Sequence, residues 1–213
     1  MAMTGFDPSL VTPSINKIND AYGQLMNALY GKMQNEFVNT MGETWACNQA
    51  QAYFRKVKEV VDALLSSSHR TFQSIVDAMN AAASDWAATT ETEWSNISFS
   101  GDLKNVDVEC IKENINGVRG IDEASATSIS NVLPKISSDA DSALSDAANA
   151  VSNCGFVGRD MEQQLVSSLN KIKADCSSQV TELANTLKQA VSDTVSSYGN
   201  VGDKIRSNFT VNG

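Results

Sequence analysis

The chain begins with a long stretch in which apolar residues recur every three or four positions. This spacing places them on one face of an α-helix. We expect the helix to begin near Thr12-Pro13, because a capping residue followed by proline is typical of a helix start, and to end near Gly42. Gly23 and Gly31 each cost about 1 kcal/mol relative to alanine, so this helix needs packing partners. The apolar stripe consists of Ile15, Ile18, Tyr22, Leu25, Leu29, Met33 and Phe37.

A second amphipathic stretch follows, and it is longer. Neither glycine nor proline occurs within residues 43–100, so one long helix fits this window. Ser68 interrupts the stripe, and we expect the helix to fade near Trp94. The stripe consists of Phe54, Val57, Val61, Leu65, Phe72, Ile75, Met79, Ala83 and Trp86.

Residues 95–121 have a different pattern. Segments 96–99 and 106–110 alternate polar and apolar residues, as a strand or an extended segment does. We interpret the whole segment as a short extended or β-like linker.

A third helix is expected from Asp122, which is a favourable capping residue. Pro134 conflicts with a continuous helix, because proline removes one hydrogen bond and clashes with the preceding turn. Either the helix is kinked at Pro134 or it begins near Ser130-Asn131, and we favour the kink. Its apolar stripe consists of Ile129, Leu133, Ile136, Ala140, Leu144, Ala147 and Val151.

A fourth helix shows the most regular pattern. Residues 159–198 contain neither glycine nor proline, and Gly199 and Gly202 are expected to end the helix. The stripe consists of Leu165, Leu169, Ile172, Cys176, Val180, Leu183, Leu187, Val191, Val195 and Tyr198.

The two bends between these helices share a pattern. Trp45-Ala46-Cys47 and Phe156-Val157-Gly158 each contain an aromatic, a spacer and a small residue. Aligning Trp45 with Phe156 also aligns the apolar positions of the two helices that follow these bends. Helical stripes match by chance fairly easily, but the shared bend argues against chance. We hypothesise a tandem repeat of helical hairpins, 1–94 and 122–213, joined by the linker 95–121.

Four helices with one apolar stripe each must cover one another. We therefore predict an all-α fold in which two long helical hairpins form an elongated antiparallel four-helix bundle. At about 1.5 Å per residue the helices are roughly 50–60 Å long. An extended linker of about 27 residues reaches roughly 90 Å, enough to travel the length of the bundle, as antiparallel hairpins require.

Composition narrows the classes of partner. The net charge of −9 disfavours nucleic acid and anionic membranes, since phosphate binding needs clustered Lys and Arg. No apolar stretch reaches the length of a spanning helix, so stable membrane insertion is not expected. The N-terminus lacks the basic and apolar regions of a cleavable signal peptide.

The four cysteines leave their redox state open. None has the Cys-x-x-Cys spacing of zinc or redox sites. Cys47, Cys110 and Cys154 are possible disulfide cysteines, and buried free thiols are the alternative. Cys176 lies on an apolar stripe and is expected in the core.

No catalytic, cofactor or metal site is predicted. His69 is the only histidine, and spacing suggests no partner for catalysis or metal binding. We therefore expect a protein that is not an enzyme.

The stretch from Gly42 to Phe54 around Trp45 resembles the bend of the Trp-x-Gly family, the small early-secreted-antigen-like substrates of type VII secretion. Members are about half this length and pair as antiparallel hairpins, so the chain resembles two such units fused. Cys47 stands where the family has glycine. The second bend has Gly158 but carries Phe156 in place of tryptophan.

The resemblance also implies a place for an export signal. In the family a tyrosine is followed four residues later by an acidic residue, after the second helix. Here Tyr198 is followed by Asp203, one residue late, and this pair is the candidate export signal. In the family, secretion depends on a composite of one partner's bend and the other's tail, and antiparallel fused hairpins would place Tyr198 near the Trp45 bend.

We thus expect a secreted substrate or self-chaperoned partner of a type VII secretion system. Its partners would be the secretion ATPase or related helical hairpin proteins. The chain would act as a monomer or weak homodimer, cytoplasmic before export and then secreted or at the cell surface. The alternative is a structural or interaction module, such as an effector leader or a phage or surface-assembly component.

Overall fold

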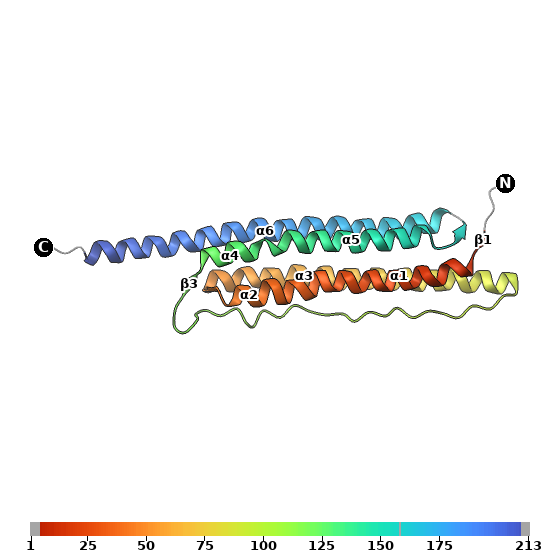
Figure 1. Ribbon diagram of the computed structural model, residues 1–213, viewed down its shortest axis with the longest axis horizontal. Coiled ribbons are helices and arrows are strands. Elements are labelled where there is room, and N and C mark those ends of the chain that lie inside the picture. The colour runs from red at the N-terminus through yellow and green to blue at the C-terminus, as the bar shows by residue number, and fades with distance from the viewer. Residues whose placement is uncertain (1–4, 158, 210–213) are drawn as a thin grey trace.

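The computed structural model describes residues 5–157 and 159–209, and most of them are helical (Figure 1). The predicted all-α class is confirmed. Four strands of two residues each form two small sheets near the ends of the helices. The helices are α1 (Pro8–Met26), η1 (Asn27–Val38), α2 (Asn39–Gly42), α3 (Asn48–Thr90), α4 (Glu123–Ser130), α5 (Val132–Ser152) and α6 (Arg159–Phe209).

The first helix begins earlier than its sequence predicts. Asp7 is the N-cap of α1, and its carboxylate accepts a hydrogen bond of 3.0 Å from the backbone N–H of Ser9. Pro8 follows at the first helical position, where the missing N–H costs nothing. The expected start at Thr12-Pro13 is therefore wrong, because Asp7-Pro8 supplies the same signal five residues earlier.

The middle of this helix is a π-helix, which the periodicity did not predict. Within η1 the backbone widens, and the N–H of Asn39 bonds to the carbonyl of Gln34, five residues back. The buried residues here recur in steps of four, more than the 3.6 residues of an α-turn, so in an α-helix they would drift around the axis. A wider turn offsets that drift. The buried residues in these steps are Leu25, Leu29, Met33, Phe37 and Met41.

The later helix boundaries agree with the sequence in part. α3 ends at Thr90, where Glu91 takes a left-handed conformation with φ of 53°, four residues before Trp94. Asp122 caps α4 as expected, accepting from the N–H of Ser125. The helix is interrupted at Asn131, between α4 and α5, just before Pro134. The chain is thus helical on both sides of the break, which agrees with the favoured kink.

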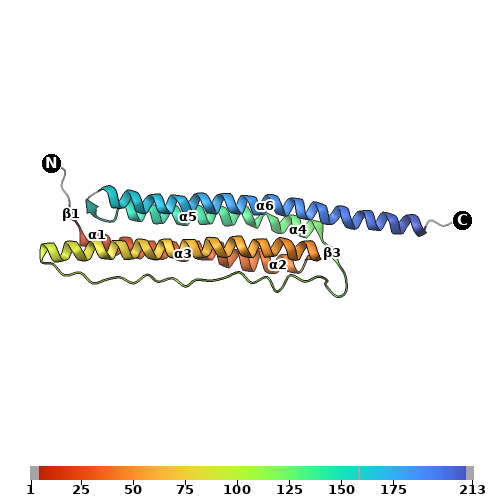
Figure 2. The same cartoon turned by 180° about the vertical axis from the view of Figure 1, so that it is seen from behind.

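The last helix does not end at its glycines. α6 continues through Gly199 and Gly202 to Phe209, so the expected end is wrong. A glycine costs only about 1 kcal/mol in a helix, and the residues around these two are compatible with helix. α6 consequently projects past the ends of the other helices (Figures 1 and 2).

The helices pack in a closed cycle of contacts. α1 packs on α3 and α5, and α6 packs on α3 and α5. The core is one apolar cluster to which all four long helices contribute. Across the helix pairs, the Tyr53 hydroxyl donates to the Leu183 carbonyl at 3.0 Å, and Lys56 pairs with Glu182 at 2.7 Å.

The linker is extended, as its alternating pattern predicts, but it forms no long strand. It runs back along the first hairpin from the end of α3 toward the start of α4 (Figure 1). A single bridge joins Ile115 and Val118 across Asn116 and Gly117, whose φ values are 52° and 81°. Positive φ at both central residues is the geometry of a type I′ turn, which favours Asn-Gly.

Gly23 offers a test of the packing around α1. A Cβ added at Gly23 meets nothing within 4 Å, whereas one at Gly101 falls 2.3 Å from the Tyr22 ring. We expect Gly23→Ala to raise the free energy of unfolding by about 0.5–1 kcal/mol through helix propensity. Gly101→Ala should lower it. Urea denaturation of both variants checks this, and a loss of stability in Gly23→Ala would contradict the packing described.

Candidate functional site

The first bend is joined to the entry of the second hairpin. Strand β2 (Trp45–Ala46) pairs antiparallel with β3 (Gly120–Ile121), with Trp45 opposite Ile121. The next backbone N–H, that of Asp122, donates to the Thr44 carbonyl at 2.8 Å. Asp122 then caps α4. We call residues 44–46 together with 120–122 the first clasp.

The second bend is joined to the entry of the first hairpin in the same way. Strand β4 (Phe156–Val157) pairs antiparallel with β1 (Gly5–Phe6), with Phe156 opposite Phe6. The N–H of Asp7 donates to the Gly155 carbonyl at 3.0 Å, and Asp7 caps α1. Residues 155–157 together with 5–7 form the second clasp.

The two clasps therefore have equivalent geometry, and Trp45 and Phe156 occupy equivalent positions. Sequence reasoning identified the bends but missed the entry segments that pair with them. A signal was present: Gly5-Phe6-Asp7 and Gly120-Ile121-Asp122 share the order glycine, apolar residue, aspartate, followed by a helix.

Trp45 lies in an aromatic cluster at the first clasp. Its side chain is fully buried, and its ring centroid lies 5.9 Å from that of Tyr53 and 6.2 Å from that of Phe54. Phe37 lies 5.6 Å from Phe54. Burial raises the pKa of Tyr53 far above its usual range, so its hydroxyl stays protonated and donates to α6. Within the described residues, the indole N–H of Trp45 has no acceptor.

The small residues at the two bends have different backbone conformations, and only one of these conformations requires glycine. Cys47 is the N-cap of α3 with φ of −174°, an extended conformation that any residue adopts, so glycine is not needed there. Gly158 lies outside the described residues. The glycine that the second bend requires is Gly155, whose φ is 83°. A Cβ on Gly155 would lie 2.8 Å from both the Asp7 carbonyl oxygen and the Leu10 Cβ.

All four cysteines are free thiols in the structure. Cys47 and Cys110 lie at the end of the molecule that holds the first clasp, and Cys110 packs against Gly42. Cys154 precedes the second clasp, separated from them by α5, whose 21 residues rise about 31 Å. A disulfide from Cys154 to either of the other two is therefore incompatible with this fold.

Burial keeps three of the thiols protonated. It raises the pKa of Cys154 to about 11 and that of Cys176 to about 12. The pKa of Cys110 is raised as well, first by burial and then by the Asp107 carboxylate. These thiols are poor nucleophiles at neutral pH. Cys176 is buried in the core, as its place on the stripe predicts.

The candidate export residues lie on the projecting part of α6. Tyr198 is 37% exposed, and Asp203 lies farther along the helix, where no side chain is described. α6 lies beside α3 where Leu183 meets Tyr53, and Tyr198 is 15 residues, about 22 Å, farther on. α6 also contacts β3, the strand that pairs with Trp45, and Thr194, about one turn before Tyr198, is fully buried. The expected position of Tyr198 near the Trp45 bend stays a prediction.

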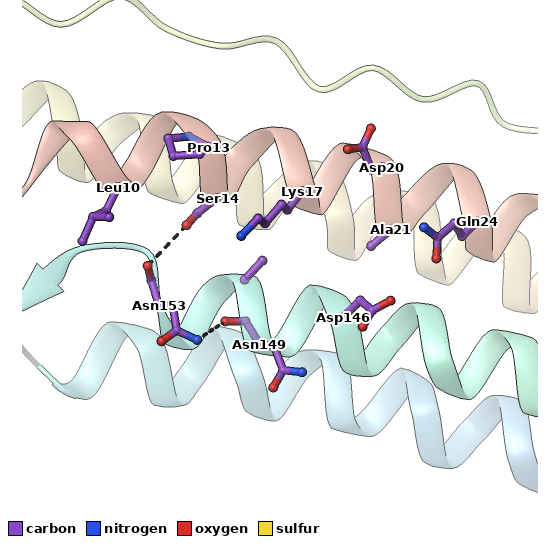
Figure 3. Close-up of a pocket in the computed structure, with 11 residues that line it drawn as sticks. Leu10, Pro13, Ser14, Lys17, Asp20, Ala21, Gln24, Asp146, Asn149 and Asn153 are labelled. Carbon is purple, nitrogen blue, oxygen red and sulfur yellow. Dashed lines mark hydrogen bonds between the residues drawn. The ribbon is translucent and has the colours of Figure 1, made fainter.

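A surface groove between α1 and α5 was not anticipated from the sequence. It has a volume of about 540 Å³ and is lined partly by Lys17, Asp20 and Asp146 (Figure 3). The Ser14 hydroxyl donates to the Asn153 carbonyl at 3.4 Å across its end. Polar and apolar residues both line it, and among the described residues that line it no nucleophile is hydrogen-bonded to a base.

Among residues 5–157 and 159–209, no group of three or more His, Cys, Asp or Glu side chains is placed to hold a metal ion. None of the helices described combines the length and apolar character that crossing a bilayer requires.

Comparison with protein-family models, with curated proteins and with solved structures finds no match for this chain.

The second clasp can be tested at Gly155. Gly155→Ala forces a side chain into a left-handed conformation and against the Asp7 backbone, which should cost about 2 kcal/mol or more. Gly120→Ala in the first clasp is the matched control, because a Cβ there meets nothing within 4 Å and should change stability by under about 0.5 kcal/mol. Chemical denaturation measures both. Equal stability of the two variants would contradict the second clasp.

The thiol state predicts a simple titration. Protein purified without reductant and then unfolded should react with four equivalents of a thiol reagent, since all four cysteines are free. In the folded protein Cys154 should react slowly at pH 8, where a pKa of about 11 leaves on the order of 0.1% thiolate. Its rate should rise as pH approaches that value. Two equivalents after unfolding would instead indicate a disulfide.

Proposed function

We propose that the chain is a fused pair of Trp-x-Gly-like helical hairpins and a substrate or self-chaperoned partner of a type VII secretion system. Its activity would be protein–protein interaction without catalysis. The observation that carries the proposal is the reciprocity of the clasps. Each bend pairs with the entry of the other hairpin, as expected if two equivalent units joined in one chain replace two separate partners.

We further propose that the two hairpins pack as one elongated antiparallel four-helix bundle. The cycle of contacts among α1, α3, α5 and α6 supports this arrangement, because each helix has two neighbours. The clasps support it too, since they put the two bends at opposite ends of the molecule.

Fusion would explain self-chaperoning. Each hairpin has an apolar face that the other hairpin covers, through α1 with α5 and α3 with α6. Covalent linkage raises the effective concentration of one half at the other to the millimolar range. The pair would therefore form without a second gene product, and each half would reach a secretion ATPase already folded.

The projecting part of α6 is the proposed contact for that ATPase or for a related hairpin protein. Residues 196–201 are exposed, with Val201 52% exposed beside Tyr198 at 37%. Trp45 is fully buried, so its proposed role is to hold the first clasp in shape while Tyr198 and Asp203 make the contact.

Export gives the test. The chain is expressed in a bacterium with a type VII system, with its secretion ATPase intact or deleted, and the amount in the medium is compared with that in cells. We expect export to depend on the ATPase and to fall at least tenfold in Tyr198→Ala. Lys188→Ala is the control, because it removes an exposed side chain of α6 outside the proposed contact and should leave export unchanged.

The two substituted positions on α6 are exposed, so a loss of export can be distinguished from a loss of folding. Circular dichroism should show the same helical content and thermal midpoint for both α6 variants. Trp45→Phe keeps an aromatic ring in the clasp and should weaken export less than Tyr198→Ala. Export that is independent of the ATPase and of Tyr198 would contradict the secretion proposal and favour the alternative of a structural or interaction module.

A further inference from the structure

The linker lies as a continuous extended strap on the first hairpin. We call residues 95–111 the strap. It is held near Asn80 of α3 at Ile97 and near Gln51 of α3 at Ile111. The helix between Asn80 and Gln51 rises about 43 Å, and the chain from Ile97 to Ile111 spans about 46 Å when extended. The strap therefore tracks the hairpin with almost no slack (Figure 2).

Side-chain amides hold the strap by its backbone. Asn80 accepts from the N–H of Ile97 at 2.9 Å and donates to its carbonyl at 2.8 Å. Gln34 accepts from the N–H of Asp107 at 2.7 Å and donates to its carbonyl at 2.8 Å. Each amide thus makes the pair of bonds that an adjacent β-strand would make.

A third amide and an ion pair extend the same pattern. Asn19 on α1 donates to the Ser98 carbonyl and accepts from the Ser100 N–H, each at 3.2 Å. The Asp62 carboxylate accepts from the N–H of Val106 at 2.7 Å, while Lys58 donates to the Val106 carbonyl. All these hydrogen bonds are to backbone atoms of the strap. They therefore fix the position of its backbone without depending on the identity of most of its side chains.

Apolar side chains on one edge of the strap fill the groove. Inward positions alternate with outward ones over 97–101 and over 106–110, while residues 102–105 are exposed, and Val106 is fully buried. The Phe99 ring lies 4.9 Å from Tyr22 and 5.3 Å from His69. Tyr22 also bonds to His69 at 2.9 Å and donates to the Asp102 carbonyl at 3.2 Å.

The strap covers the amides that hold it. Asn80 and Gln34 are only 7% and 9% exposed with the strap in place, and the strap supplies backbone partners to both. The residues that flank the strap, 91–93 and 112–114, are exposed, so the strap is attached by solvated segments.

We propose that the groove between the first helix (α1 with η1) and α3 is a binding site for extended polypeptide and that the strap is its ligand in cis. The partner in trans is an extended segment with free backbone N–H groups at the positions of Ile97 and Asp107. It carries apolar side chains at alternate positions. This proposal is independent of export.

The test frees the strap within the full chain. Protease recognition sequences are inserted between Thr92 and Glu93 and between Lys112 and Glu113, and both are cut. A fluorescent synthetic peptide of residues 95–111 is then added, and its anisotropy is followed. We expect saturable binding that the same unlabelled peptide reverses, and no binding to the uncut protein, where the strap occupies the groove.

Backbone recognition is tested with N-methylated peptides. Methylation at Ile97 and Asp107 removes the N–H groups that Asn80 and Gln34 accept, and should weaken binding at least tenfold. Methylation at Leu103 and Lys104 is the control, since no hydrogen bond of their N–H groups is found within the described part of the chain. That peptide should bind like the unmodified one.

Three other outcomes would contradict the proposal. Equal binding of the two methylated peptides would show that the side-chain amides of Asn80 and Gln34 do not recognise the peptide backbone. A cut protein that stays helical but does not bind the peptide would show that the groove accepts no ligand in trans. Loss of helical circular dichroism on cutting would show that the strap is an inseparable part of the hairpin.

Discussion

Reciprocal backbone pairing at the two ends of the molecule is the interaction on which the rest of the structure depends. The Asp122 N–H bonds to Thr44, and the Asp7 N–H bonds to Gly155. Each bond joins the entry of one hairpin to the bend of the other. The same aspartates cap α4 and α1, so one residue ends the strand pairing and starts the helix. The positions of both hairpins relative to each other follow from these two points.

The course of the linker is a consequence of that pairing. α3 ends at Thr90, far from the first clasp, and the chain must return to Gly120 to pair there. A helix would cover too little distance per residue, whereas an extended chain covers about twice as much. An extended chain leaves its backbone groups without internal partners, and buried backbone groups need them. Asn19, Gln34 and Asn80 supply those partners from the helices that the linker crosses.

Much of the fold was predictable because amphipathic helices are local. Steps of three and four identify them, and Asp122 and Pro134 mark the start and kink of the third. The clasps were not predictable in this way, since Trp45 pairs with Ile121 across the whole of α3 and the linker. Asn80 looks like an ordinary surface residue in the sequence, and only the strap gives it a role. The end of α6 was misjudged because a glycine weakens a helix without ending it.

Trp45 and Tyr198, the two residues that carry the resemblance, differ in exposure. Trp45 lies where a bend residue of a Trp-x-Gly hairpin is expected, but it is buried and supports a clasp. Tyr198 lies on an exposed helix beyond the clasp, so any partner that reads it approaches α6 directly. Assembly is thus carried by the clasps, and the proposed recognition by the part of α6 that projects past the first clasp (Figure 1).

Amide hydrogen exchange followed by NMR tests the central claim most directly. The N–H groups of Asp7 and Asp122 are the two that join the hairpins. If reciprocal clasps hold the molecule, both should be protected and should exchange only through openings as costly as those of the helix cores. Exchange of either amide at the rate of an unstructured peptide, while α1 and α3 remain protected, would contradict the account.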